Sequence, residues 1–277
     1  MATREVRVPD RQCPTVIRRV LTAAALVLLA TQNGTAQSEN PEIAKRRAAQ
    51  QTSFSDRQII DGFDKIAFRA ELQFDRPVER IRKFDEPVRL FVTGGAAHRG
   101  DELAAIVADI GAHVNHLDLA MSADPQTANF VVTLVPKRDL ARTIRFYYGP
   151  NRARKIQRRL RPQCLSGIGK DANYRIRRAE AIVPDDVDDF SFYDCAYEEL
   201  LQGLGVINDD SSVPWTMFND KVQMGFFDVY DQYLVNILYD PAVRPGMTKS
   251  EVHVLLPEIL PKVRAWVAKV NPLERAN

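Results

Sequence analysis

The chain has 277 residues, which is enough for one large domain or two small ones with an ample core. Its 38 basic and 36 acidic residues nearly cancel, so no overall charge excess indicates nucleic acid or another anionic polymer as a partner. The charges are unevenly distributed, because basic residues concentrate in residues 137–161 and acidic residues in residues 180–240.

Residues 1–36 have the pattern of a secretory signal peptide. Arginines precede an apolar run at residues 20–30, and small residues at positions 34 and 36 permit cleavage before Gln37. The apolar run is too short to span a bilayer. We therefore expect a periplasmic or secreted protein with no membrane span after cleavage; a retained signal anchor is the alternative.

Two cysteines remain after such a cleavage, because Cys13 is lost with the signal peptide. In an oxidising compartment, Cys164 and Cys195 are most simply a disulfide. A free, reactive Cys195 is the alternative, but it would need a histidine base, and the neighbouring sequence contains none.

The first half of the chain predicts alternating helices and strands. Residues 37–54 are polar and without apolar period, which indicates a flexible lead-in. Ser55 and Gln58 match a capping box for a helix that runs to about Leu72. Further predicted elements are a strand at 87–93 ended by Gly94 and Gly95, a helix from Asp101 to Gly111, and strands at 117–121 and 130–135.

The basic segment at residues 137–161 contains ten basic residues and one acid. Its composition favours a helix, broken at Gly149 and Pro150, that forms an insertion on the surface. Its aromatic residues are clustered at 146–148 and not interleaved with the basic ones, so a solvated face is favoured over nucleic-acid binding.

The second half predicts one strand and three helices. Residues 174–183 resemble an edge strand, and residues 190–204 a central helix with one apolar and one polar face. A capping box at 248–251 begins a C-terminal helix, which the prolines should break or restart. The remaining predicted elements are a helix at 228–239, the breaks at Pro257 and Pro261, and a tail at 271–277.

The central helix ends in a motif, Glu198 to Asn208, that resembles the metzincin zinc signature H-E-x-x-H-x-x-G-x-x-H without its histidines. Glu199 matches the general-base glutamate, and Gly205 matches the glycine. The sequence around Met217 resembles a Met-turn. This resemblance implies one α/β (α+β) zincin-like domain at residues 55–270, with a mixed twisted sheet and the motif-bearing helix beneath it.

The positions of the missing zinc ligands carry Glu198, Gln202 and Asn208. These residues offer only oxygen donors and one charge, whereas catalytic zinc usually has at least two histidines, so we expect no zinc and no cofactor. Asp209 follows the motif and could add a carboxylate for a hard cation.

The mature chain is also similar to an uncharacterised family of secreted proteobacterial proteins. The pattern is carried by E-E-L-x-Q-x-L-G from Glu198, preceded by Cys164 and Cys195 and followed by Leu238-Tyr239-Asp240-Pro241. The resemblance implies that E-E-L-x-Q is the family's own motif. It supplies no activity.

Two functions remain open. The leading hypothesis is a non-catalytic cell-envelope protein that binds a peptide or cell-wall glycan through Gln202, Asn208, Asp209 and Arg177. The rival is a hydrolase in which Glu199 activates water, with an oxygen-liganded metal or with none.

The charge state of the two glutamates should distinguish these functions. We expect an arginine from the 174–183 strand, among Arg175, Arg177 and Arg178, to neutralise Glu199 and make the pair a structural anchor. If Glu198 and Glu199 instead share one groove, the pKa of at least one should rise.

Overall fold

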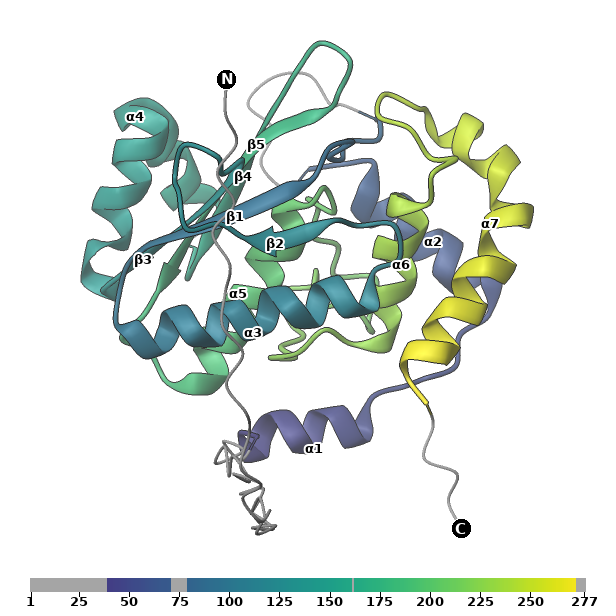
Figure 1. The fold of residues 1–277 in the computed structure, drawn as a ribbon, viewed down its shortest axis with the longest axis horizontal. Coiled ribbons are helices and arrows are strands. Elements are labelled where there is room, and N and C mark those ends of the chain that lie inside the picture. The colour runs from purple at the N-terminus through teal and green to yellow at the C-terminus, as the bar shows by residue number, and fades with distance from the viewer. Residues whose placement is uncertain (1–38, 71–78, 161, 273–277) are drawn as a thin grey trace, which may run out of the picture. The chain divides into compact units, whose positions relative to one another are not determined.

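The computed structural model describes residues 39–70, 79–160 and 162–272. These residues form an α/β domain around a five-stranded sheet with the order β2-β1-β3-β5-β4 (Figure 1). The α/β class expected from the sequence is confirmed. The predicted signal peptide lies outside the described residues.

The sheet and its helices follow one another along the chain as predicted in most places. The strands are β1 (Val88–Gly94), β2 (Leu119–Met121), β3 (Phe130–Val135), β4 (Leu165–Lys170) and β5 (Ile176–Pro184). The helices are α1 (Pro41–Ala49), α2 (Asp56–Ala67), α3 (Ala97–His113), the short 3-10 helix η1 (Lys137–Asp139), α4 (Leu140–Arg159), α5 (Asp189–Gly203), α6 (Val229–Tyr239) and α7 (Lys249–Val270).

The predicted edge strand at 174–183 is wrong in its place in the sheet. β5 lies inside the sheet, parallel to β3 on one side and antiparallel to β4 on the other. Its apolar run Ala181–Val183 is typical of a strand covered on both faces. The edge belongs to β4, which the sequence did not reveal because its glycines, Gly167 and Gly169, weaken the strand pattern.

The basic segment covers one face of the sheet. Ile182 of β5 packs with Leu140, Ile144 and Ile156 of α4, whereas its neighbours Ala181 and Val183 belong to the main core. Because alternate residues of a strand face opposite sides, α4 lies on the face opposite the main core. The expected break is present at Gly149, whose φ is +72°. The sequence predicted only an insertion on the surface, whereas four residues of this helix are buried and dock it against the sheet.

The segment expected to be a flexible lead-in contains helix α1. Asn40 caps its first turn, and Ile43 is buried at 4 % exposure. Arg46 and Arg47 stack over aromatic rings of the domain, with the Arg47 guanidinium 4.3 Å from the Phe226 ring. The helix is stabilised by these tertiary contacts, which a search for apolar period does not detect.

The two prolines of the C-terminal helix do not break it. The capping box at Thr248 and Glu251 is present, and α7 continues through Pro257 and Pro261. Each proline removes one backbone donor. The apolar face around Leu256, Ile259 and Val263 is buried against the domain, and this packing overrides the local cost.

The central helix α5 lies very close to the sheet at Gly203. A Cβ atom at this position would be 2.3 Å from the Phe130 ring of β3, far inside contact distance. Only glycine therefore permits the observed separation of α5 from β3. This contact fixes where the polar face of α5 is held.

Candidate functional site

Helix α5 positions the motif. Asp188 caps its N-terminus by accepting from the Ser191 N–H at 3.0 Å. Phe192, Ala196 and Leu200 are buried in the core, whereas Ser191, Asp194 and Glu198 lie on another face of the helix. The helix is followed by Gly205, where φ is +124° and a Cβ atom would lie 2.1 Å from the Arg82 carbonyl oxygen.

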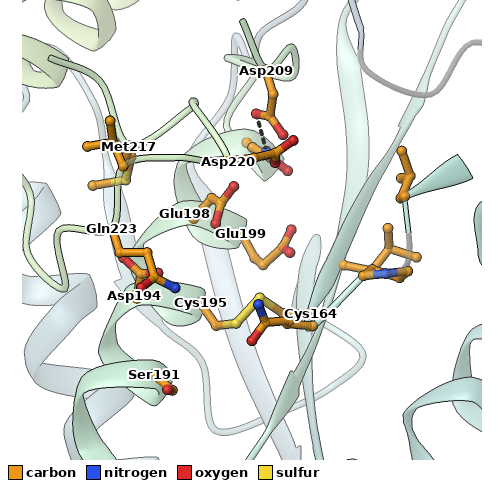
Figure 2. Close-up of a pocket in the computed structure, with 16 residues that line it drawn as sticks. Cys164, Ser191, Asp194, Cys195, Glu198, Glu199, Asp209, Met217, Asp220 and Gln223 are labelled. Atoms are coloured by element: carbon orange, nitrogen blue, oxygen red, sulfur yellow. Dashed lines mark hydrogen bonds between the residues drawn. A yellow bond between two sulfur atoms is a disulfide. The ribbon is translucent and has the colours of Figure 1, made fainter. Parts of the chain in front are cut away.

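The polar face of α5 borders a cavity of about 310 Å³, which we call the acidic cavity (Figure 2). Glu198 and Glu199 extend from the helix, with Asp209 and Asp220 on the loop beyond it. The other lining residues are Leu160, Pro162, Gln163, Cys164, Leu165, Ser191, Asp194, Cys195, Gln202, Met217, Val222 and Gln223.

Five carboxylates line this cavity, and no lysine, arginine or histidine is among its described lining residues. Arg161, between two lining residues in sequence, lies outside the described part of the chain. The five carboxylates are those of Asp194, Glu198, Glu199, Asp209 and Asp220.

Glu198 has the most perturbed environment of these acids. Burial raises its pKa well above the ordinary value, and the charge of Glu199 raises it further. The charges of Asp209, Asp194 and Asp220 act in the same direction. A carboxyl group in this position retains its proton at a pH at which a solvated glutamate is ionised.

Two further acids titrate near neutral pH. Burial and the charge of Asp220 raise the pKa of Asp209 to about 7, although a hydrogen bond from Gln202 opposes the shift. Burial raises the pKa of Asp194 to about 6, against hydrogen bonds from two backbone N–H groups on the loop before α6. The net charge of the cavity therefore becomes more negative as the pH rises through this range.

Gln202 is held on both sides. Its Nε2 donates to Asp209 at 3.0 Å, and its Oε1 accepts from the Ser166 hydroxyl of β4 at 3.0 Å. The motif glutamine thus connects α5 to the edge strand and to the loop that carries Asp209.

Cys164 and Cys195 form the predicted disulfide, which lines the acidic cavity (Figure 2). It joins the residue before β4 to the middle of α5. Met217 is buried and lines the same cavity.

Asn208 and Arg177 do not join the site. The Asn208 amide donates to the Lys65 carbonyl at 2.8 Å, so this side chain closes a loop against α2. Arg177 is 43 % exposed and contacts Asp171 at 3.1 Å and Glu86 at 3.4 Å.

The expected arginine anchor is wrong. Arg175 forms its ion pair with Asp85 at 2.9 Å, and Arg177 pairs as described above. Arg178 packs over Gly169, and its charge acts on Glu180. Since β5 is an inner strand, its exposed arginines lie near its start and contact neighbouring loops. The alternative, a raised glutamate pKa in a shared groove, describes Glu198.

Several lining residues were not predicted. Asp194 precedes Glu198 by four positions, so helical spacing could have placed it on the same face. Asp220 and Gln223 come from an irregular loop and Gln163 from the segment before β4, where no periodic signal exists. Only the tertiary fold brings these segments together.

The oxygen-rich lining does not form a compact metal site. Within the described ranges, no three His, Cys, Asp or Glu side chains are grouped to hold a metal ion.

None of the described helices is long and apolar enough to cross a membrane.

Comparison with known proteins gives a family and no activity. A family model described as a protein of unknown function, DUF2927, matches residues 56–258. The chain belongs to the DUF2927 family. The DUF2927 match extends from the start of α2 into α7 and includes every residue that lines the acidic cavity. No curated protein and no solved structure matches this DUF2927 chain.

Proposed function

We propose that this protein is an exported, non-catalytic binding protein whose acidic cavity holds a positively charged group of a peptide. The observation that carries the proposal is the convergence of Asp194, Glu198, Asp209 and Asp220 on one cavity whose described lining contains no basic residue. Bringing such acids together raises the pKa of Glu198 and Asp209 and costs stability. A cationic ligand offsets that repulsion.

A peptide fits the surroundings of the cavity better than a glycan. β4 is the outer strand of the sheet, and Leu165 at its start lines the cavity. The outer side of an edge strand offers backbone N–H and C=O groups to an extended peptide. A lysine or arginine side chain, or a free amino terminus, supplies the positive charge.

The proposed origin is a zinc-protease scaffold that has lost its metal ligands. Supporting features are Glu199 in the helix, Gly205 after it and the buried Met217 beside the cavity. Of the three positions that would carry zinc ligands, Asn208 donates to Lys65 and Gln202 is held by two hydrogen bonds. This set does not present three metal donors.

Export rests on the signal-like N-terminus and is supported by the disulfide, since disulfides persist in oxidising compartments. The site proposed for the ligand would then face the periplasm or the exterior. Mass spectrometry of the exported protein tests this: an intact N-terminus would contradict cleavage before Gln37.

Calorimetric titration with a lysine-containing peptide tests the binding function. Affinity should rise about tenfold or more between pH 5 and pH 8, because Asp194 with a pKa of about 6 and Asp209 with a pKa of about 7 become ionised. Asp209→Asn should weaken binding at pH 8, because this carboxyl group is ionised there. An affinity independent of pH and of Asp209 would contradict the proposal.

The second candidate function is hydrolysis by an acid and base pair. The observation in its favour is the proton-retaining Glu198 beside the buried Glu199, since acid and base roles need neighbouring carboxyl groups with different pKa values. Glu199→Gln separates the two functions. It should change peptide affinity only a few-fold, whereas multiple turnover abolished by this variant would establish catalysis.

A further inference from the structure

A second cavity of about 210 Å³ adjoins the acidic cavity and shares Leu160, Leu165 and Gln202 with it. Sites for whole small molecules measure about 300 Å³ or more, so the second cavity alone is sized for one part of a ligand. It lies between α4, β4 and the loop after α5. Its remaining lining residues are Ala70, Tyr148, Arg152, Ile156, Ser166, Gly167, Ile168 and Ile207.

The chemistry of the second cavity differs from that of its neighbour. More than half of its described lining residues are aliphatic and none of them is acidic, although the basic Arg152 also contributes to the lining. Burial first, and then the charge of Glu180, raises the pKa of Tyr148, so its phenol stays neutral. Transfer of an apolar group from water into such surroundings is favourable.

One hydrogen-bonded side chain connects the two cavities. Gln202 lines both and is fixed between Ser166 of β4 and Asp209 of the acidic cavity. Glu199, one turn before Gln202 on α5, lies near enough for its charge to act on Tyr148. A single ligand can therefore contact both cavities across Gln202.

We propose that the second cavity is a specificity subsite for a bulky apolar side chain on the same peptide whose cationic group occupies the acidic cavity. The inference rests on the function proposed above and narrows its ligand. The ligand class is a peptide in which lysine or arginine neighbours a residue such as leucine, methionine or phenylalanine. Charge complementarity sets the orientation, because only one cavity is lined by carboxylates.

Three synthetic peptides with acetylated amino termini test the subsite on the oxidised protein at pH 8. One contains Lys-Leu, the second Lys-Gly, and the third norleucine-Leu, in which the ammonium group is absent. Calorimetry should show the Lys-Leu peptide binding about tenfold or more tighter than the Lys-Gly peptide, from burial of the leucine side chain. The norleucine-Leu peptide should bind weakest, because it lacks the charge.

Substitutions in the second cavity supply the structural test. Ala70→Phe fills the cavity from a half-buried position, and Ile168→Ser removes part of its apolar lining. Both should abolish the preference for Lys-Leu while Lys-Gly binding stays unchanged. The matched control, Ala172→Phe at an exposed position in the turn before β5, should leave the preference intact.

The outcomes separate this inference from the function on which it rests. Equal binding of the Lys-Leu and Lys-Gly peptides overturns the subsite and leaves the cationic site standing. A preference that survives both Ala70→Phe and Ile168→Ser also overturns the subsite. Binding that ignores the ammonium group, or no binding of either lysine peptide, overturns the proposed function as well.

Discussion

Two groups of buried carboxylates in this domain differ in whether they line the acidic cavity. Asp231, with no exposed surface, accepts from the Thr216 hydroxyl and from the Met217 N–H, and its partner Asp228 accepts from the first N–H groups of α6. In the acidic cavity, the charges of Glu199, Asp209, Asp194 and Asp220 all act on Glu198, and all four are negative.

The difference distinguishes structural acids from acids available to a ligand. Burial first, and then Asp228, raises the pKa of Asp231 well above its ordinary value, so one proton is retained between the two aspartates. This pair accepts its hydrogen bonds from the chain itself and fixes the loop that carries Met217. In the acidic cavity, Asp209 and Asp194 also accept hydrogen bonds from the chain, but Glu198 is surrounded by the negative charges of other carboxylates, which an added cation would offset.

The largest expected effect is on the Asp228–Asp231 pair. Asp231→Ala leaves the Thr216 hydroxyl and the Met217 N–H without their acceptor, so the free energy of unfolding should fall by about 3 kcal/mol. Urea denaturation measures the change. Asp231→Asn, which retains an acceptor oxygen, should lose clearly less, and equal losses would contradict a structural role for the hydrogen bonds.

A smaller effect of opposite sign is expected in the acidic cavity. The pKa of Asp209 is about 7 in the fold, against 3.8 for a free aspartate, so the folded state binds more protons between these values. Stability should therefore fall as the pH rises from about 4 to about 7, by on the order of 1 to 2 kcal/mol, and remain lower above pH 7.

Asp209→Asn should remove this penalty and make the protein more stable at pH 8 by a similar amount. Asp210→Asn is the matched control. Although burial raises the pKa of Asp210, hydrogen bonds from Ser212 lower it overall, so this substitution should reduce stability at pH 8. A loss of stability in Asp209→Asn would show that Asp209 is a structural acid. The acidic cavity would then not differ from the Asp228–Asp231 pair.

The smallest effect is expected at Arg177. Its contacts with Asp171 and Glu86 are exposed, and such pairs contribute little. Arg177→Ala should change neither the denaturation midpoint nor the affinity for a lysine-containing peptide. A strong change in that affinity would place a positive charge at the site and contradict the proposed cationic ligand.

The sequence predicted the parts of this domain whose signals are local. The capping boxes at Ser55 and Thr248, the break at Gly149 and the face of α5 that carries Glu198 all depend on residues a few positions apart. The cysteine pairing followed from the number of cysteines and from the oxidising compartment that the signal-like N-terminus predicts.

The missed features depend on long-range packing. β4 was not recognised because its glycines obscure the strand pattern, and α1 because its stability comes from Ile43 and from arginines stacked on distant rings. The arginine anchor failed for the same reason: once β4 forms the edge, the start of β5 contacts the loop of Asp85 and Glu86.

The contact at Gly203 has a consequence for how this family can diverge. The distance between α5 and β3 is set by the missing methyl group at position 203 and by the aromatic ring of Phe130. A larger residue at 203 would displace the helix and, with it, both glutamates. Positions 203 and 130 should therefore vary together among relatives, with a side chain at 203 tolerated only where residue 130 has become small.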